Sequence, residues 1–287
     1  MQRVAGEVDG RLAVLDLPLP EAEVVPGVSW GRFDHPLTPA FWAAQTWMSD
    51  LPTGPRFRLG ETLAEEVVAC LLGGHGAPAE VGLAAYTRVR DALRSRGDGT
   101  LPLDVAQRLL SEPLDVGDRR VRYRFARTRA GYLSACLDGL RGVDEASHGD
   151  VALRDVLTKL PGIGPKTASW VVRNRRASDA VAILDVHIVR ACQVMGVFAV
   201  GAAPARGYRE LERRYLDLCL GLGCRASVLD AVMWATMRKL SVPLYNLIVD
   251  APGRFADKPS PRTKGRNLCQ ARTTPAAISA ARGARPT

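Results

Sequence analysis

The sequence predicts a mainly α-helical protein with a short extended N-terminal segment and a disordered basic C-terminal tail. Apolar residues recur at helical spacing through most of residues 38–240. A glycine-rich turn followed by a proline separates two such segments near residue 163. Beyond residue 250 the chain consists mostly of Ala, Pro, Arg, Thr and Gly without periodicity, which is typical of disorder.

The composition indicates a globular protein. The 287 residues are 47% hydrophobic, enough for one large domain or two small ones. There is no run of about eighteen apolar residues, and the N-terminus lacks an apolar signal-peptide core, which argues against membrane insertion and secretion. We therefore expect a cytoplasmic protein.

The net charge of +9 suits a polyanionic partner, but most of it lies in the tail. Residues 251–287 carry eight basic residues and one acidic residue, a charge of +7, which leaves +2 for residues 1–250. Specific binding must then come from a local patch, while the tail adds a salt-sensitive attraction that ignores sequence.

The N-terminal half begins with residues 1–36, where short apolar runs among Pro, Gly and Glu indicate one or two strands. Thr38 can cap a helix that has Pro39 at its first position. A loop rich in Pro and Gly leads to a predicted helix over 61–72, and three glycines around His75 then predict an exposed turn.

Helices are predicted over 80–94 and 105–110, and the densest basic stretch of the chain follows at 118–129. That stretch has six arginines, one aspartate and interleaved aromatics. It is either a solvated helix face or a contact for DNA phosphate. We favour phosphate, because the arginines would repel one another without a counter-charge.

The central motif is a helical hairpin over 151–174. Apolar spacing predicts a helix over 151–160 and a second from Thr167, joined by Gly162-Ile163-Gly164. The glycines let backbone amides face a phosphate at the start of the second helix. Ile163 is expected to pack between the helices and hold the turn rigid.

Lys166 stands out because the chain has only five lysines among 39 basic residues. An amine can lose its proton and act as a nucleophile, whereas a guanidinium cannot, so Lys166 is a candidate for Schiff-base formation. The alternative is an ordinary surface lysine on a helix.

Asp185 follows Lys166 by nineteen residues, after a short apolar approach over 180–184. It can cap a helix over 186–195, and a carboxylate fixed at a helix start can also stabilise a developing positive charge. His187 is expected to position the site or to contact phosphate rather than act as a base.

These two motifs, Leu-Pro-Gly-Ile-Gly-Pro-Lys-Thr-Ala and Leu-Asp-Val-His, resemble the helix-hairpin-helix DNA glycosylase superfamily. The resemblance covers about residues 59–240. It implies two helical lobes meeting at a cleft, with Lys166 attacking the sugar carbon and Asp185 stabilising the cationic sugar. A lysine at this position marks the members that also nick the strand as AP lyases.

The resemblance also assigns residues that contact DNA. His75 falls where a side chain fills the hole left by an extruded base, although a solvent-exposed turn histidine is an equal alternative. Arg129 takes the position of an arginine that reads the cytosine opposite the lesion. Thr128 and Glu80 depart from the residues expected beside it and in a second reading position, which puts opposite-base selectivity in doubt.

Amphipathic helices are predicted over 208–222 and 227–240. In the second, Asp230 and Trp234 resemble the base-recognising pair of the 8-oxoguanine enzymes. A carboxylate can accept both N1–H and the N2 amine of guanine. Trp170, one turn after Lys166, is the expected second wall of the pocket. Alternatively, both tryptophans belong to the core.

Six cysteines, at 70, 136, 192, 219, 224 and 269, are scattered, several of them in apolar helical patterns. The related endonuclease III and adenine-excising branches hold an iron–sulfur cluster with four cysteines after the catalytic region. This chain has only Cys219 and Cys224 there, so we expect no cluster and no other cofactor, and the match moves towards the 8-oxoguanine DNA glycosylase branch.

The sequence thus predicts an N-terminal segment (1–58) packed on a glycosylase domain (59–250), followed by a basic tail (251–287). The expected function is excision of oxidised guanine from double-stranded DNA in base excision repair, by a nucleoid-associated monomer. Two alternatives are a glycosylase for another guanine-like base and a non-catalytic DNA-binding protein.

Overall fold

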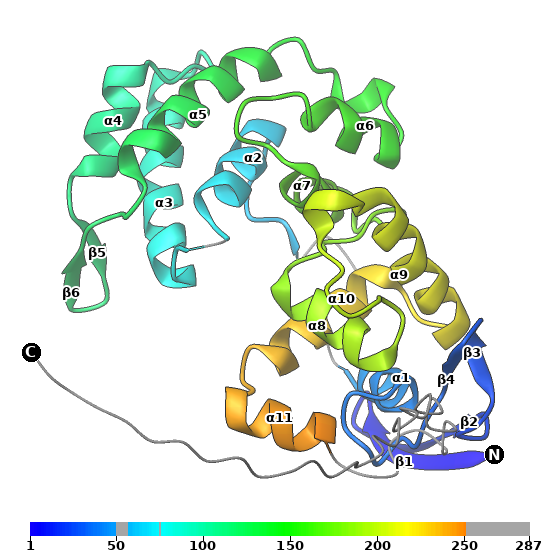
Figure 1. Ribbon diagram of the computed structural model, residues 1–287. Coiled ribbons are helices and arrows are strands. Elements are labelled where there is room, and N and C mark those ends of the chain that lie inside the picture. Colours follow the sequence, from blue (N-terminus) through cyan, green and yellow to red (C-terminus); the bar gives the residue numbers. More distant parts are fainter. Residues whose placement is uncertain (50–56, 75, 251–287) are drawn as a thin grey trace, which may run out of the picture. The chain divides into compact units, whose positions relative to one another are not determined.

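The computed structural model describes residues 1–49, 57–74 and 76–250, so the predicted disordered tail lies outside the described residues. The described part is mainly α-helical, which confirms the predicted fold class (Figure 1). The α-helices are α1 (Pro39–Trp47), α2 (Leu63–Leu72), α3 (Ala79–Arg96), α4 (Leu103–Ser111), α5 (Ala126–Leu140), α6 (Asp150–Leu157), α7 (Pro165–Arg176), α8 (Val186–Met195), α9 (Tyr208–Leu222), α10 (Ala226–Met237) and α11 (Val242–Asp250). The strands are β1 (Gln2–Val8), β2 (Arg11–Leu17), β3 (Glu23–Val25), β4 (Val28–Ser29), β5 (Leu114–Val116) and β6 (Arg119–Val121).

The N-terminal segment contains four strands rather than the one or two expected. Strands β1 and β2 form an antiparallel hairpin in which Val8 pairs with Arg11. The two residues between them, Asp9 and Gly10, both have positive φ, at 49° and 73°. An Asp-Gly pair in this conformation forms the tight turn that matches the twist of two antiparallel strands. Strands β3 and β4 form a second antiparallel pair.

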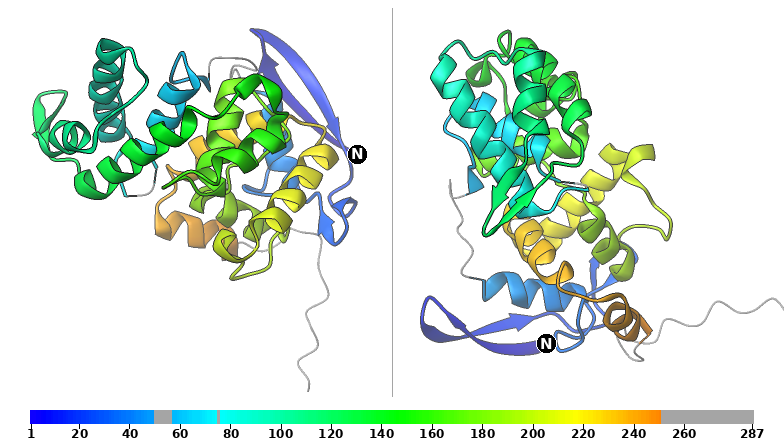
Figure 2. Two further views of the ribbon diagram at one scale, coloured as in Figure 1. Left: turned by 90° about the horizontal axis from the view of Figure 1, so that it is seen from above. Right: turned by 90° about the vertical axis from the view of Figure 1, so that its left-hand side faces the viewer.

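Two hydrophobic cores organise the described helices. The first joins the N-terminal strands and α1 to α8, α9 and α10, with Trp42 and Tyr215 fully buried in it. Figure 2 shows the N-terminal strands lying against α1. The second core is built by α2 to α7 and includes Ile163, which is 4% exposed. The chain therefore leaves the first core after α1 and returns to it at α8.

Only residues 126–129 of the basic stretch 118–129 are helical, as the first turn of α5, so most of the stretch is not a helix face. Arg119 and Arg120 belong to β6, which pairs with β5 in a short antiparallel hairpin. Both side chains are exposed, whereas Tyr123, in the middle of the stretch, is buried in the second core. The helix α5 begins three residues later, at Ala126.

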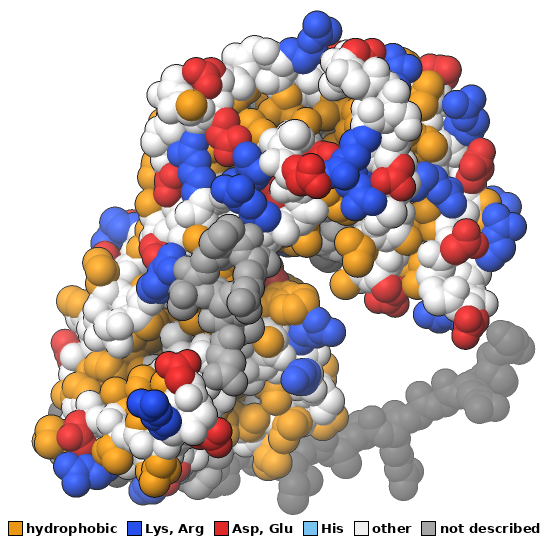
Figure 3. All heavy atoms as spheres, turned by 180° about the vertical axis from the view of Figure 1, so that it is seen from behind, with side chains coloured by type: hydrophobic (Ala, Val, Ile, Leu, Met, Phe, Trp, Pro, Cys, Tyr) orange, Lys and Arg blue, Asp and Glu red, His pale blue; other side chains and the backbone are white. Residues whose placement is uncertain are grey.

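Charges of both signs are mixed over the surface seen in Figure 3, where Lys and Arg side chains alternate with Asp and Glu. This mixture agrees with the small net charge of residues 1–250. Within the described ranges no single helix has the length and apolarity needed to cross a bilayer, although α9 and α10, bent by 100° at their junction, would meet that test together by length and composition.

Candidate active site

The hairpin between α6 and α7 has the predicted form. Gly162 adopts a positive φ of 78°, and a β-carbon there would lie 2.5 Å from Cγ of Tyr132. Gly164 precedes α7 with ordinary backbone angles and has open space where a side chain would be. Among the described side chains none caps the first turn of α7, so its amides face outward in the arrangement that favours an anion. Pro165 occupies the first helical position.

Lys166 and Trp170 lie on one face of α7, as their spacing predicted. The Nζ of Lys166 is 5.7 Å from the centroid of the Trp170 ring. Trp170 is partly buried and packs against the second core. The ring therefore forms a fixed apolar surface beside the amine.

The glycine loop after α2 comes close to this pair. A β-carbon at Gly73 would lie 3.1 Å from Cη2 of Trp170, and one at Gly74 would lie 3.7 Å from Nζ of Lys166. Because side chains are absent at both positions, the space beside the amine stays open. His75, predicted to fill the gap in the duplex, lies outside the described residues.

Asp185 caps α8, as predicted. Its Oδ1 accepts hydrogen bonds from the backbone amides of His187 and Ile188, at 2.8 and 2.9 Å. These bonds fix the direction of the carboxylate at the start of the helix. His187 is partly buried, and its backbone amide is engaged by this cap.

The segment that leads to Asp185, residues 180–184, is held in place by two side chains of α9. The hydroxyl of Tyr208 donates to the carbonyl of Ala182 at 2.6 Å and accepts from the amide of Leu184 at 3.4 Å. The amide of Ala182 donates to Oε1 of Glu212 at 3.0 Å. Burial raises the pKa of the Tyr208 phenol, which keeps it neutral and able to serve as both donor and acceptor.

Glu212 is in turn paired with a buried arginine of α6. The Nη1 of Arg154 donates to both carboxylate oxygens of Glu212, at 2.8 and 2.7 Å. Arg154 is 1% exposed and Glu212 is 5% exposed. The amphipathic pattern of residues 208–222 does not distinguish the buried Glu212 from the exposed charged residues of α9. Charge alone does not identify a carboxylate that points inward.

Asp230 lies on α10 with its side chain only 8% exposed. Its Oδ2 accepts a hydrogen bond from Nη2 of Arg173 at 2.8 Å. Burial raises the pKa of the Asp230 carboxyl to about 6; Arg173 and Lys166 oppose this shift and Asp185 adds to it. The groups predicted to attack and to stabilise charge therefore both act electrostatically on the carboxyl predicted to read the base.

Arg173 was not singled out from the sequence. It lies on α7, seven residues after Lys166 and so on the same helix face. Its guanidinium stacks over the ring of Phe57, 4.4 Å from the centroid. The seven-residue spacing from Lys166 could have indicated that Arg173 belongs to the site. Arg175 and Arg176 lie in the same last turn of α7, so the sequence did not distinguish Arg173 from them.

The structure does not bring the two tryptophans of the predicted pocket into contact. Trp234 on α10 is 39% exposed, and the guanidinium of Arg238 lies over its ring, 4.4 Å from the centroid. The rings of Trp170 and Trp234 make no aromatic contact within the described ranges. A base held between them stays a prediction.

Arg129 is partly exposed near the start of α5. It lies close enough to the buried phenol of Tyr123 to lower that group's pKa, against the larger effect of burial. The same phenol donates to the carbonyl of Leu72 at 2.7 Å, directly before the glycine loop. Tyr123 thus links the segment of Arg129 to the loop that approaches Lys166.

The cysteines of the described part are free thiols, and Cys70, Cys136, Cys192 and Cys219 are buried. Burial raises the pKa of the Cys136 thiol to about 12, so this residue packs as a small hydrophobe. In the residues that the structure describes, no three or more His, Cys, Asp or Glu side chains gather as metal ligands would.

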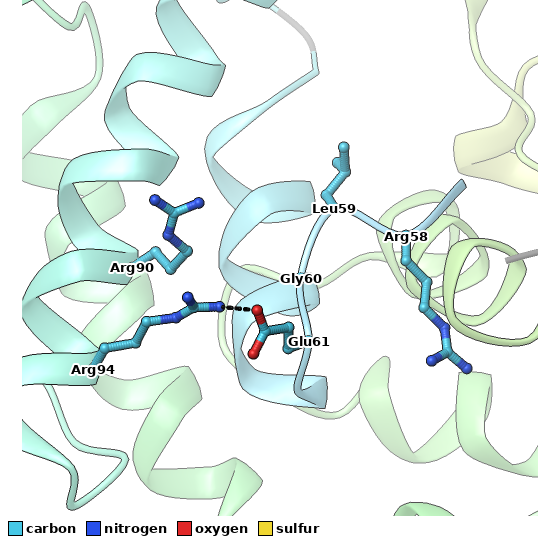
Figure 4. Close-up of a pocket in the computed structure, with 6 residues that line it drawn as sticks. All are labelled: Arg58, Leu59, Gly60, Glu61, Arg90 and Arg94. Carbon is cyan, nitrogen blue, oxygen red and sulfur yellow. Dashed lines mark ion pairs between the residues drawn. The ribbon is translucent and has the colours of Figure 1, made fainter. Parts of the chain in front are cut away.

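A separate cavity of 420 Å³ lies between segment 58–61 and α3 (Figure 4). Its lining residues are Arg58, Leu59, Gly60, Glu61, Arg90 and Arg94. The Arg94 guanidinium pairs with Glu61 at 3.0 Å and with Glu65 at 2.6 Å. None of the predicted site residues lines this cavity, so we place the candidate active site around Lys166 instead.

Comparison with known proteins gives one family match, to the model described as 8-oxoguanine DNA glycosylase, over residues 61–223. Similar solved structures include two 8-oxoguanine DNA glycosylases. That of Methanocaldococcus jannaschii is 26% identical, with 62% of this chain and 78% of that chain covered and a TM-score of 0.48. That of Thermotoga maritima is 23% identical, with 61% and 78% covered and a TM-score of 0.47.

Proposed function

This chain belongs to the 8-oxoguanine DNA glycosylase family, and we propose that it excises 8-oxoguanine from duplex DNA and then cleaves the abasic site through a Schiff base on Lys166. The observation that carries the proposal is the set of groups around Lys166. Its Nζ lies 5.7 Å from the centroid of the Trp170 ring and next to Gly74, whose missing side chain leaves space beside the amine. Lys166 and the helix-capping Asp185 also both act electrostatically on the buried Asp230 carboxyl. A lysine used only to bind phosphate does not need such neighbours.

The first step is attack on the sugar. The unprotonated Nζ of Lys166 forms a bond to C1′ of the deoxyribose while the bond from C1′ to the base breaks, and the base leaves with the electron pair and takes up a proton. Positive charge develops on the sugar as the base departs. The Asp185 carboxylate, fixed by two amide hydrogen bonds, stabilises that charge without having to reorient.

The second step breaks the DNA strand. When the sugar ring opens, the bond from C1′ to O4′ breaks, O4′ takes up a proton and the nitrogen lone pair forms the C1′=N bond of a protonated Schiff base between Nζ and C1′. This linkage acidifies the hydrogen atoms on C2′. Removal of one of them expels the 3′ phosphate, so the strand is cut by β-elimination.

Base selection is proposed to rest on Asp230, which accepts hydrogen bonds from N1–H and the N2 amine of the extruded guanine. Trp170 and Trp234 offer surfaces for stacking, and the hairpin Gly162-Ile163-Gly164 holds the backbone phosphate. Arg129, His187 and His75 are proposed to complete the DNA contacts.

In this proposal the protein acts in the cytoplasm on nucleoid DNA, as a monomer and without a metal ion or an organic cofactor. Residues 59–250 carry the chemistry and residues 1–58 pack on them. The tail 251–287, with a charge of +7, increases attraction to DNA without regard to sequence.

Borohydride trapping tests the chemistry and the substrate together. The wild-type protein is expected to form a covalent adduct with duplex DNA that contains 8-oxoguanine opposite cytosine, because borohydride reduces the Schiff base to a stable amine. Lys166→Gln is expected to form none, since its amide is not a nucleophile. Undamaged duplex is the control for the substrate.

The remaining outcomes separate the alternatives. An adduct with a pre-formed abasic site but not with 8-oxoguanine would point to a lyase that acts on a different base. The absence of an adduct with either DNA would favour a protein that only binds DNA through its hairpin.

A further inference from the structure

Arg173 carries a donor group that the proposed chemistry does not use. Its side chain is 13% exposed, and its Nη2 donates to Oδ2 of Asp230. Its Nη2 carries two hydrogens, and the bond to Asp230 uses one of them, so the second remains for an acceptor on a ligand.

The position of the guanidinium is fixed by its surroundings. Its face stacks over the ring of Phe57, so only its edges remain to make hydrogen bonds. Neutralising the charge of Asp230 does not by itself require this stacking. The fixed plane indicates that the direction of the donors matters.

The ion pair presents a donor and an acceptor side by side. Nη2 of Arg173 and Oδ2 of Asp230 are 2.8 Å apart. The Watson–Crick edge of guanine presents the complementary order, with the acceptor O6 next to the donor N1–H and then the N2 amine. Adenine has an amine and an unprotonated N1 at the first two places, so it would set donor against donor and acceptor against acceptor.

We propose that Arg173 is a specificity-determining residue, which donates to O6 of the extruded oxidised guanine while Asp230 accepts from N1–H and the N2 amine. This inference rests on the proposed function, because it concerns the base that the glycosylase extrudes. It adds to that function the proposal that the ion pair of Arg173 and Asp230, rather than the carboxylate alone, recognises the base. Lys166, on the same face of α7, is thereby placed in register with the base that Arg173 holds.

Two base analogues separate the contributions of the pair. In 8-oxo-6-thioguanine, O6 is replaced by sulfur, a weak acceptor, while N1–H and the N2 amine remain. In 8-oxohypoxanthine, O6 and N1–H remain and the N2 amine is absent. The first analogue reports on Arg173 and the second reports on Asp230.

The test compares single-turnover excision by wild type and by Arg173→Met, in duplexes that differ only in the damaged base. Both proteins are assayed at alkaline pH, because loss of the Arg173 charge raises the pKa of the Asp230 carboxyl further and the carboxyl must be ionised in both proteins to accept the guanine donors. Wild type is expected to excise the 6-thio analogue about 10- to 100-fold more slowly than 8-oxoguanine, the effect of one hydrogen bond to a charged group. Arg173→Met is expected to lose about that factor on 8-oxoguanine while its rate on the 6-thio analogue stays unchanged. Both proteins should disfavour 8-oxohypoxanthine to the same extent.

Cleavage of a pre-formed abasic site is the control, because it needs Lys166 but no base. Failure of wild type to excise 8-oxoguanine would overturn the proposed function itself. If wild type excises 8-oxoguanine and its 6-thio analogue equally fast, Arg173 does not read O6. This outcome is measured on wild type alone, so it does not depend on whether a variant folds. If Arg173→Met slows both bases and the abasic-site reaction alike, Arg173 is structural and the inference is wrong.

Discussion

At the scale of single residues, Asp185 combines a structural and a chemical role. Its carboxylate caps α8 through two amide hydrogen bonds, and in the proposed mechanism it stabilises the cationic sugar. A cap requires only an oxygen acceptor, whereas stabilising a cation requires a negative charge. The two roles can therefore be separated by a substitution that removes the charge alone.

Asp185→Asn is expected to lower excision of 8-oxoguanine by about 100-fold, because it removes the charge that faces the sugar. Asparagine caps helices as well as aspartate does, so the free energy of unfolding should change by less than about 0.5 kcal/mol. Single-turnover excision and urea denaturation measure the two quantities. If a stable Asp185→Asn protein excises 8-oxoguanine as fast as wild type, the negative charge of Asp185 is not needed for excision.

The ionisation of Asp230 is expected to make recognition of the base depend on pH. Its carboxyl pKa is raised to about 6, chiefly by burial, with Arg173, Asp185 and Lys166 as the charged groups that act on it. Only the ionised form accepts both guanine donors, so excision of 8-oxoguanine should fall as pH falls through about 6. Because the folded-state pKa is raised, the contribution of Asp230 to the free energy of unfolding decreases as pH rises through the same range.

The pH profile is measured with wild type and Asp230→Asn, on both 8-oxoguanine and a pre-formed abasic site. Asp230→Asn should lack the inflection near pH 6, and the abasic-site reaction of wild type should lack it as well. The same inflection in all four profiles would mean that another group titrates.

At the scale of elements, the two hairpin glycines have different reasons to be glycine. Gly162 has a positive φ and lies against Tyr132, so a side chain there meets both backbone strain and a collision. Gly164 has ordinary angles and open space around it, so a side chain there would project towards a bound phosphate. Backbone strain and the contact with Tyr132 require glycine at position 162, and we propose that glycine at position 164 leaves space for a phosphate.

Gly162→Ala is expected to lower the free energy of unfolding by about 2 kcal/mol or more. Gly164→Ala is expected to leave stability nearly unchanged and to weaken DNA binding on damaged and undamaged duplexes alike. Urea denaturation and fluorescence anisotropy measure these effects on the same pair of proteins. Full DNA affinity in Gly164→Ala would show that phosphate does not approach this amide.

The segment 180–184, which leads to Asp185, has no regular secondary structure, and side chains of neighbouring helices hold it in place. Glu212 and Tyr208 bind its backbone, and Arg154 neutralises Glu212. Truncating Arg154 would leave a buried carboxylate unpaired, a change that typically destabilises proteins by about 3 to 5 kcal/mol. The cap of α8 is therefore positioned by a network that reaches from α6 through α9.

At the scale of the whole molecule, the candidate site joins two hydrophobic cores. Lys166 begins a helix of the second core, whereas Asp185 and Asp230 belong to helices of the first. The ion pairs from Arg173 to Asp230 and from Arg154 to Glu212 cross between them. The distance from the proposed nucleophile to the proposed charge-stabilising group thus depends on how the cores pack together.

The distribution of charge over the molecule predicts that the tail contributes to DNA binding and the remaining residues to the chemistry. Deleting residues 251–287 removes +7 of the +9 net charge. DNA affinity and its dependence on salt should both fall, and the slope of log affinity against log salt should decrease by about 0.9 for each phosphate that the tail had neutralised. Excision at saturating protein should be spared. Loss of turnover at saturation would show instead that the tail supports the chemistry.

The sequence alone determined the local features of this protein. The helical spacing, the helix starts at Thr38 and Asp185 and the glycine turn of the hairpin were all predicted, because each depends on residues near one another in the chain. The shared face of Lys166 and Trp170 follows from helix geometry in the same way.

Only the tertiary structure decided which charged groups are buried and with what partner. Arg154 and Glu212 are 58 residues apart, and Arg173 and Asp230 are 57 apart, so no local pattern links them. A carboxylate at a helical position has the same sequence pattern whether it faces water or a buried arginine. The identity of the pair around Asp230, and hence the inferred role of Arg173, is therefore decided by the packing of the two cores against each other.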